Sequence, residues 1–114
     1  MRILYDSKQS MYKSPFGTLT PGQECTLHIH IPAQVEATKV ICILNYDGGS
    51  NAQNIPLTLE SRKGPYEIFS GRFSIPQPGL YFYYFFIDTT DGSFRLFKQG
   101  DDTNMEAGDQ WQLS

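Results

Sequence analysis

The sequence lacks the features that mark a nucleic-acid binder, a membrane protein or an exported protein. Its 9 Lys and Arg residues are outnumbered by 12 Asp and Glu residues, and no basic run is present. Proteins that grip phosphate backbones need clustered positive charge, so we expect no nucleic-acid partner. The longest apolar run, Leu80 to Ile87, has 8 residues, whereas a membrane-spanning helix needs about 20. Asp6 and Lys8 interrupt the start before a signal peptide could form, so we expect a cytoplasmic protein without a membrane partner.

The chain is also too short for the large catalytic folds. A (β/α)₈ barrel needs roughly 250 residues, while 114 residues suit one domain with a single core. Neither a Gly-rich phosphate loop nor a Gly-x-Ser-x-Gly elbow occurs, and the carboxylates fall in turns. We therefore predict one domain over residues 1–114, with no catalytic residue and no cofactor.

Cysteine and alanine are scarce. Cys25 and Cys42 are the only cysteines, which is too few for a disulfide scaffold. The sequence favours two buried free thiols and leaves a bridge between them open. Alanine occurs only 4 times while aromatic residues make up 14% of the chain, a composition that favours strands over helices.

Alternation of polar and apolar residues predicts an all-β fold. Residues 25–31 place Cys25, Leu27, Ile29 and Ile31 on one face, and Thr26, His28 and His30 on a solvent-facing one. Gly and Pro punctuate the junctions at intervals typical of a sandwich. We predict an immunoglobulin-like antiparallel β-sandwich of about seven to eight strands, with a polar loop over 98–109. The strands expected from the pattern are 25–31, 39–46, 56–62, 66–75, 80–88, 93–97 and 111–113.

The strand at residues 80–88 is apolar on both faces, so it must be covered twice. Tyr81, Tyr83, Phe85 and Ile87 are expected in the core, with Tyr81 opening the strand as a tyrosine corner. The outer face then carries Phe82, Tyr84 and Phe86. A contiguous aromatic stripe is rarely left exposed. Two covers stay open: the chain's own N-terminal segment or a loop, and an interface with another domain or subunit.

Two patterns offer potential metal ligands. His28 and His30 lie two residues apart on one strand face, but no third ligand is assigned to them. Asp102, Asn104 and Glu106 present oxygens at alternate positions without the glycine and spacing of an EF-hand loop. Solvated side chains are the favoured interpretation of both patterns. We predict no metal site, and calcium at the acidic loop stays open.

Aromatic side chains near turns are the remaining chemical signal. The C–H faces of a sugar ring stack on aromatic rings while polar neighbours bond the hydroxyls. Core packing is the commoner role for any single ring. The rings expected near turns or on outward positions are Tyr5, Tyr12, Phe16, Tyr46, Tyr66, Tyr84 and Trp111.

The order of these motifs resembles one known family. The motifs are, in order along the chain, Tyr5-Asp6-Ser7-Lys8, Tyr12-Lys13-Ser14-Pro15-Phe16-Gly17, Asn45-Tyr46-Asp47, Pro78-Gly79-Leu80-Tyr81-Phe82-Tyr83-Tyr84-Phe85 and Trp111-Gln112-Leu113. Taken together, they resemble the N-terminal domain of neopullulanases, cyclomaltodextrinases and maltogenic amylases, α-amylase-superfamily hydrolases whose first domain is classed as a starch-binding module. The resemblance covers essentially the whole chain. It implies a catalytic barrel after position 114, so we expect this domain to have been excised from a longer enzyme.

The resemblance also implies partners and site residues. It implies α-glucan oligosaccharides as ligands, the catalytic domain of the same or a partner subunit as protein partner, and a dimer in the parent. In that family the loop after the third strand helps to roof the partner's cleft, and by position this loop is Tyr46 to Asn51. A structural interaction module without sugar binding is the alternative, and a small standalone enzyme is a weaker third. The expected carbohydrate-binding or interface residues are Tyr46, Asp47, Phe82, Tyr84, Phe86 and Trp111.

Overall fold

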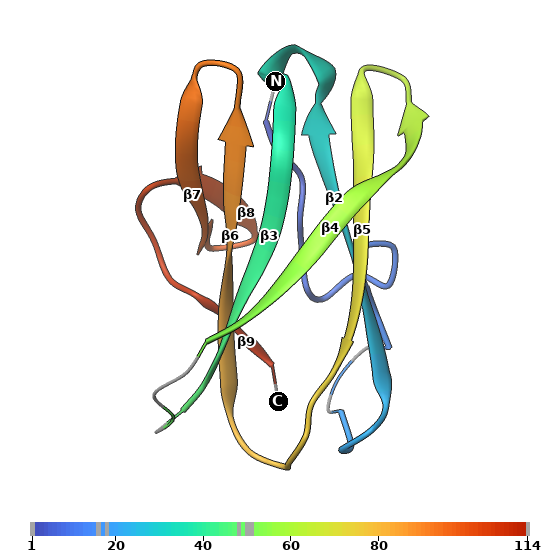
Figure 1. The fold of residues 1–114 in the computed structure, drawn as a ribbon, viewed down its shortest axis with the longest axis vertical. Helices are drawn as coiled ribbons and strands as arrows, with labels where there is room; N and C mark the ends of the chain where they lie inside the picture. Colours follow the sequence, from blue (N-terminus) through green and yellow to red (C-terminus); the bar gives the residue numbers. More distant parts are fainter. Residues whose placement is uncertain (1, 16, 18, 48, 50–51, 114) are drawn as a thin grey trace.

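The computed structural model describes residues 2–15, 17, 19–47, 49 and 52–113. In it the chain folds into two layers of antiparallel strands (Figure 1). No α-helix occurs in these residues; one turn of 3₁₀ helix, Ala33–Val35, joins two strands. The strands are β1 (Lys13–Ser14), β2 (Glu24–Pro32), β3 (Ala37–Tyr46), β4 (Ala52–Lys63), β5 (Tyr66–Ser74), β6 (Tyr81–Thr89), β7 (Gly92–Gln99), β8 (Asp102–Met105) and β9 (Trp111–Leu113). The predicted all-β sandwich is confirmed.

One strand belongs to both layers. The first half of β4 pairs with β3, from Ala52 opposite Asn45 to Leu57 opposite Val40. Its second half pairs with β5, from Thr58 onward. Figure 1 shows β4 crossing diagonally between the layers. We call β1, β2, β5 and the second half of β4 sheet A, and β3, β6, β7, β8, β9 and the first half of β4 sheet B.

Alternating side chains from both sheets fill the space between them. In β6, Tyr81, Tyr83, Phe85 and Ile87 are at most 3% exposed, which confirms their predicted core positions. Apolar residues at every second position of β2 face them from sheet A, as the period of two requires. The β2 residues Cys25, Leu27, Ile29 and Ile31 are all 0% exposed.

Buried tyrosine hydroxyls find partners inside the fold. Tyr81 donates its hydroxyl to the carbonyl of Gln77 at 2.8 Å, the contact that defines a tyrosine corner. The hydroxyls of Tyr5 and Tyr83 lie 2.6 Å apart in the core. Burial raises the pKa of both phenols. Such pairing removes the cost of burying an unpaired polar group.

The expected loop at 98–109 is wrong in its first part. Asp102–Met105 forms β8, which pairs antiparallel with β7, Leu96 lying opposite Met105. A tight turn with Gly100 at φ 61° reverses the chain, a conformation that glycine adopts without strain. Because β8 lies at an edge of sheet B, three of its four side chains are polar and Met105 is exposed, so the strand carries no apolar alternation.

Among the described residues, no helix is long and apolar enough to cross a bilayer.

Candidate functional site

The outer side of sheet B carries the predicted stripe of rings. Phe82, Tyr84 and Phe86 alternate along β6 with the core residues and are half-buried. Register brings Ile43 of β3 opposite Tyr84, and Ile41 opposite Phe86. Cross-strand partners share one face of a sheet. We call Ile41, Ile43, Phe82, Tyr84, Phe86 and Phe97 the aromatic face.

Phe97 of β7 supplies part of the second cover. Its ring stacks on Tyr84 with centroids 5.2 Å apart and planes inclined by 26°. The N-terminal segment, by contrast, packs on the inner side, where the Tyr5 ring lies 4.9 Å from Phe85. The described N-terminal residues therefore do not cover the aromatic face, whose rings stay partly open to solvent.

A depression of about 440 Å³ lies at the β7 side of this face. Phe86 and Phe97 provide apolar lining, while Arg95 and Glu106 provide a guanidinium and a carboxylate; Ser93 and Phe94 complete the lining. Arg95 lies directly opposite Phe86 across the β6–β7 ladder. Within the described part of the chain, neither Arg95 nor Glu106 has an ion pair or a side-chain hydrogen bond. Both side chains are exposed to solvent.

The segment between β8 and β9 closes one side of the depression. The Glu106 amide donates to the Arg95 carbonyl at 2.7 Å, and the backbones of Lys98 and Asp109 bond each other reciprocally at 2.8 Å. Between these points Gly108 lies against β7, where an added Cβ would sit 2.5 Å from the Lys98 carbonyl oxygen. The segment is thus pinned to β7 at both ends.

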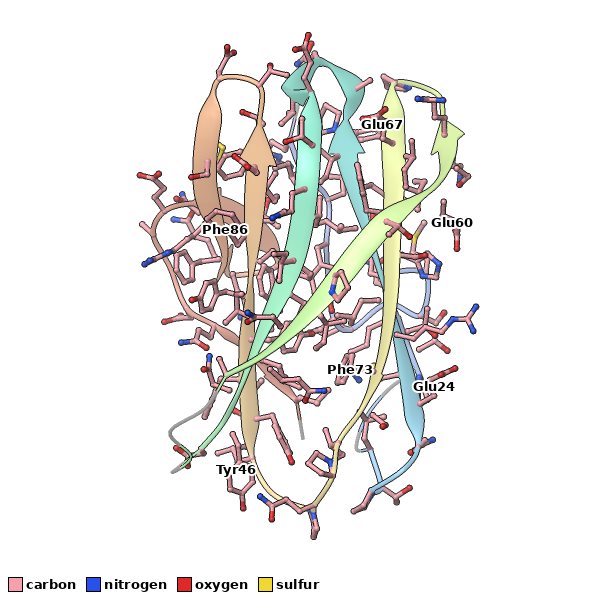
Figure 2. The ribbon with its side chains drawn as sticks, viewed as in Figure 1. Glu24, Tyr46, Glu60, Glu67, Phe73 and Phe86 are labelled. Carbon is pink, nitrogen blue, oxygen red and sulfur yellow. The ribbon has the colours of Figure 1, made fainter. Side chains whose placement is uncertain are left out.

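Tyr46 lies at the lower end of sheet B in Figure 2, whereas Phe86 lies part-way along the sheet. Its ring contacts Tyr81 edge to face, with centroids 5.0 Å apart. It also lies so close to Gly79 that a Cβ there would be 2.4 Å from Tyr46 Cε1. The half-buried ring lines a recess of about 250 Å³ whose polar lining includes Gln53 and Gln77.

The two other expected site residues differ in exposure. Asp47 is exposed, and its amide donates to the Leu80 carbonyl at 2.8 Å. Gly48, Ser50 and Asn51 of the expected glucan-contacting loop lie outside the described residues. Trp111 is only 2% exposed, with its ring 5.0 Å from Tyr5 and 5.9 Å from Tyr83. Its expected place in a surface site is corrected: it is a core residue.

His30 was expected to face solvent, but the structure shows that it is buried. It is 8% exposed because the Tyr12 ring packs 4.9 Å from its own, and Leu4 bridges to its backbone. Burial, followed by the charges of Lys63 and His28, lowers the pKa of His30. His28 instead faces Glu60 at 3.4 Å.

The three oxygen-bearing side chains of the acidic segment have separate contacts. Asp102 forms an ion pair with Arg2, the Asn104 amide donates to Gln99 at 2.7 Å, and Glu106 lines the depression described above. In the described ranges, no group of three His, Cys, Asp or Glu residues is arranged to hold a metal ion.

Both cysteines are buried and free, as the sequence favours. Burial raises the pKa of Cys25 to about 11 and that of Cys42 still further. Such thiols are protonated near neutral pH and make poor nucleophiles.

Comparison with known proteins shows the fold. No family model matches the chain, and no curated protein matches it by sequence. Among solved structures, 20 chains match. One is a cyclomaltodextrinase, with a TM-score of 0.69 and 11% identity over 98% of this chain. This chain spans 19% of that protein. The resemblance stated from the motifs is therefore confirmed at the level of the fold.

Proposed function

We propose that this chain is a non-catalytic accessory domain of a glycoside hydrolase acting on starch-derived α-glucans or cyclodextrins. The observation that carries the proposal is the likeness to a cyclomaltodextrinase, which covers 98% of this chain but only 19% of the enzyme. A domain of this share leaves most of such an enzyme for a catalytic barrel. The barrel, and not this chain, then supplies the carboxylates that cleave the glycosidic bond.

The aromatic face is the proposed surface for association with the rest of the enzyme or with a partner subunit. Phe82, Tyr84 and their neighbours Ile41 and Ile43 form a contiguous apolar area. Apolar patches of this kind mark protein interfaces, because covering them removes hydrocarbon from water. Asn45 lies beside Phe82 and adds a neutral amide, a group that can bond across an interface at little desolvation cost.

The Tyr46 recess is the proposed glucan contact at the other end. Its half-buried ring is held by Tyr81 and Gly79, and amide groups of Gln53 and Gln77 line the same recess. An aromatic ring beside amides suits a sugar, whose C–H face is apolar and whose hydroxyls both donate and accept.

A structural module without sugar binding is the second candidate. The burial of Trp111, at 2% exposure, favours it, because the ring most suited to stacking on sugars is committed to the core. In this alternative the aromatic face docks protein and Tyr46 only packs the end of the sandwich.

The test is to express the whole reading frame that contains this sequence and to assay it on starch and β-cyclodextrin beside the 114-residue chain. The longer product is expected to hydrolyse both, and the 114-residue chain neither. A reading frame without a glycoside hydrolase barrel, or hydrolysis by the 114-residue chain alone, would overturn the proposal.

The association surface has its own test in the longer product. Ile43→Ser with Phe82→Ser is expected to weaken subunit or domain association, measured by sedimentation velocity. The matched pair Thr58→Ala with Ser70→Ala alters facing positions of sheet A and should leave association intact. Equal behaviour of the two pairs would remove the aromatic face from the proposal.

A further inference from the structure

We propose that the aromatic face docks on the same face of a second copy of this chain, around a two-fold axis that runs between β3 and β6. The inference rests on the proposed function for the assignment of this face to association. It goes further by naming the partner and the alignment in which the two copies meet.

The strand order of sheet B fixes the position of the axis. β3 and β6 pair from Ala37 opposite Thr89 to Tyr46 opposite Tyr81, and Figure 1 shows them side by side. The first half of β4 flanks β3, and β7 flanks β6. A two-fold axis parallel to the strands, between β3 and β6, sets β6 of one copy over β3 of the other with the strands roughly aligned, as in other stacked sheets. Each outward residue of β6 then faces, on the second copy, the residue that is its β3 neighbour within its own chain.

The apolar side chains along this axis match one another in size. Phe86 lies opposite Ile41, and Tyr84 lies opposite Ile43, in the β3–β6 ladder. All four are half-buried. The two-fold axis sets each ring over a smaller aliphatic side chain of the second copy, so that the two faces can interdigitate. Docking then removes the hydrocarbon that is still exposed on this face from contact with water.

One cation and one anion border the same axis. Lys39 of β3 lies directly opposite Asp88 of β6; Lys39 is exposed and Asp88 is half-buried. None of the ion pairs formed by the described residues includes either side chain. The axis sets Lys39 of each copy over Asp88 of the other, so that two ion pairs form. A two-fold interface requires a surface that is complementary to itself, and this pair of charges meets that requirement.

The flanking strands bring no like charges together. The axis sets Arg95 and Phe97 of β7 over the first half of β4 on the second copy. The exposed side chains there include Pro56 and Asn54, which are uncharged. An unrelated partner has no need of a face that matches itself, so the charge pattern favours a second copy as the occupant.

Charge reversal in the 114-residue chain, which has a complete core of its own, tests the arrangement by sedimentation equilibrium. The wild type is expected to dimerise. Lys39→Glu alone and Asp88→Lys alone each set like charges against each other at both symmetry-related contacts, and each should weaken dimerisation at least about tenfold. An equimolar mixture of the two variants restores opposite charges in a heterodimer and should associate as the wild type does.

Matched variants control for charge reversal as such. Arg72→Glu and Glu24→Arg reverse exposed charges on sheet A and should dimerise as the wild type does. Unchanged circular dichroism confirms that each variant is folded. Because a misfolded variant cannot be rescued by mixing, recovery in the mixture also separates a lost contact from lost structure.

The outcomes separate this inference from the proposed function. A monomeric wild type at submillimolar concentration, unchanged dimerisation of both single variants, or a mixture that fails to associate overturns the inference. Each of these results leaves the accessory-domain proposal in place if the whole reading frame hydrolyses starch. If that product is inactive but the mixture associates, the proposed function fails and the interface between copies stands.

Discussion

The outer faces of the two sheets follow the same alternation and have opposite chemistry. Sheet A carries ion pairs on its outer side, His28 with Glu60 at 3.4 Å and Arg72 with Glu24 at 3.9 Å, and Glu60 also accepts from Ser70 at 3.1 Å. None of the ion pairs formed by the described residues involves β3, β6 or β7, which present aromatic and aliphatic side chains instead. A face whose charges are paired is suited to water, whereas the aromatic face is suited to a partner.

Removing the support beneath the aromatic face should have the largest effect. Trp111→Ala deletes a ring that contacts Tyr5, Tyr83 and Phe85 in the core, and the resulting cavity should cost about 3–5 kcal/mol. The free energy of unfolding in urea measures this loss. The neighbouring exposed Gln112→Ala should change it little, and equal losses would contradict the core assignment.

The ring pair on sheet B should be coupled more strongly than the ion pair on sheet A. A double-mutant cycle of Tyr84→Ala and Phe97→Ala is expected to give about 0.5–1.5 kcal/mol of coupling. The cycle of His28→Ala and Glu60→Ala should give about 0.2–1 kcal/mol, at the lower end because both groups meet solvent. A larger coupling on sheet A would reverse the comparison.

His30 should make sheet A sensitive to acid. Its pKa is lowered in the folded state by burial, Lys63 and His28, so below about pH 6.5 the unfolded chain binds more protons than the folded one. Stability is therefore complete above that pH, falls as the pH is lowered through it, and levels off below the folded pKa. His30→Asn should remove this part of the loss in urea titrations between about pH 7.5 and about pH 5.

The exposed pair on sheet A should matter least. Both Glu24 and Arg72 are more than half exposed, so Glu24→Gln is expected to change stability by less than about 0.5 kcal/mol. Added sodium chloride should abolish even that difference, because salt screens exposed charges. A larger, salt-resistant loss would show that this face is more than a solvated surface.

Local alternation was enough to predict much of the fold. The pattern of β6 predicts four core residues and three outward rings correctly, and the Gly-Leu-Tyr start predicts the corner at Tyr81, whose hydroxyl reaches Gln77. These features depend only on a period of two and on one short-range contact.

The burial of other residues depends on contacts between segments distant in sequence, which local alternation does not predict. His30 is buried by Tyr12 from a segment without a clear strand pattern. Trp111 is buried because β9 pairs with β6, which turns the ring toward Tyr83.

The depression could not be predicted for a similar reason. Arg95 lies beside Phe86 only through the hairpin register, and Glu106 follows β8, for which the sequence pattern predicts a loop. The alternation of Phe94 and Leu96 with Arg95 and Phe97 was the one local signal that placed part of this site on the outer face.

One measurement tests most directly whether a glucan binds at the Tyr46 recess at the end of sheet B. ¹⁵N-labelled 114-residue chain is titrated with maltoheptaose and its amide shifts are followed. The largest shifts are expected at Tyr46, Gln53 and Gln77, with the amides of Glu24, Glu60 and Arg72 unmoved. Shifts centred on sheet A, or none at millimolar sugar, would contradict the account.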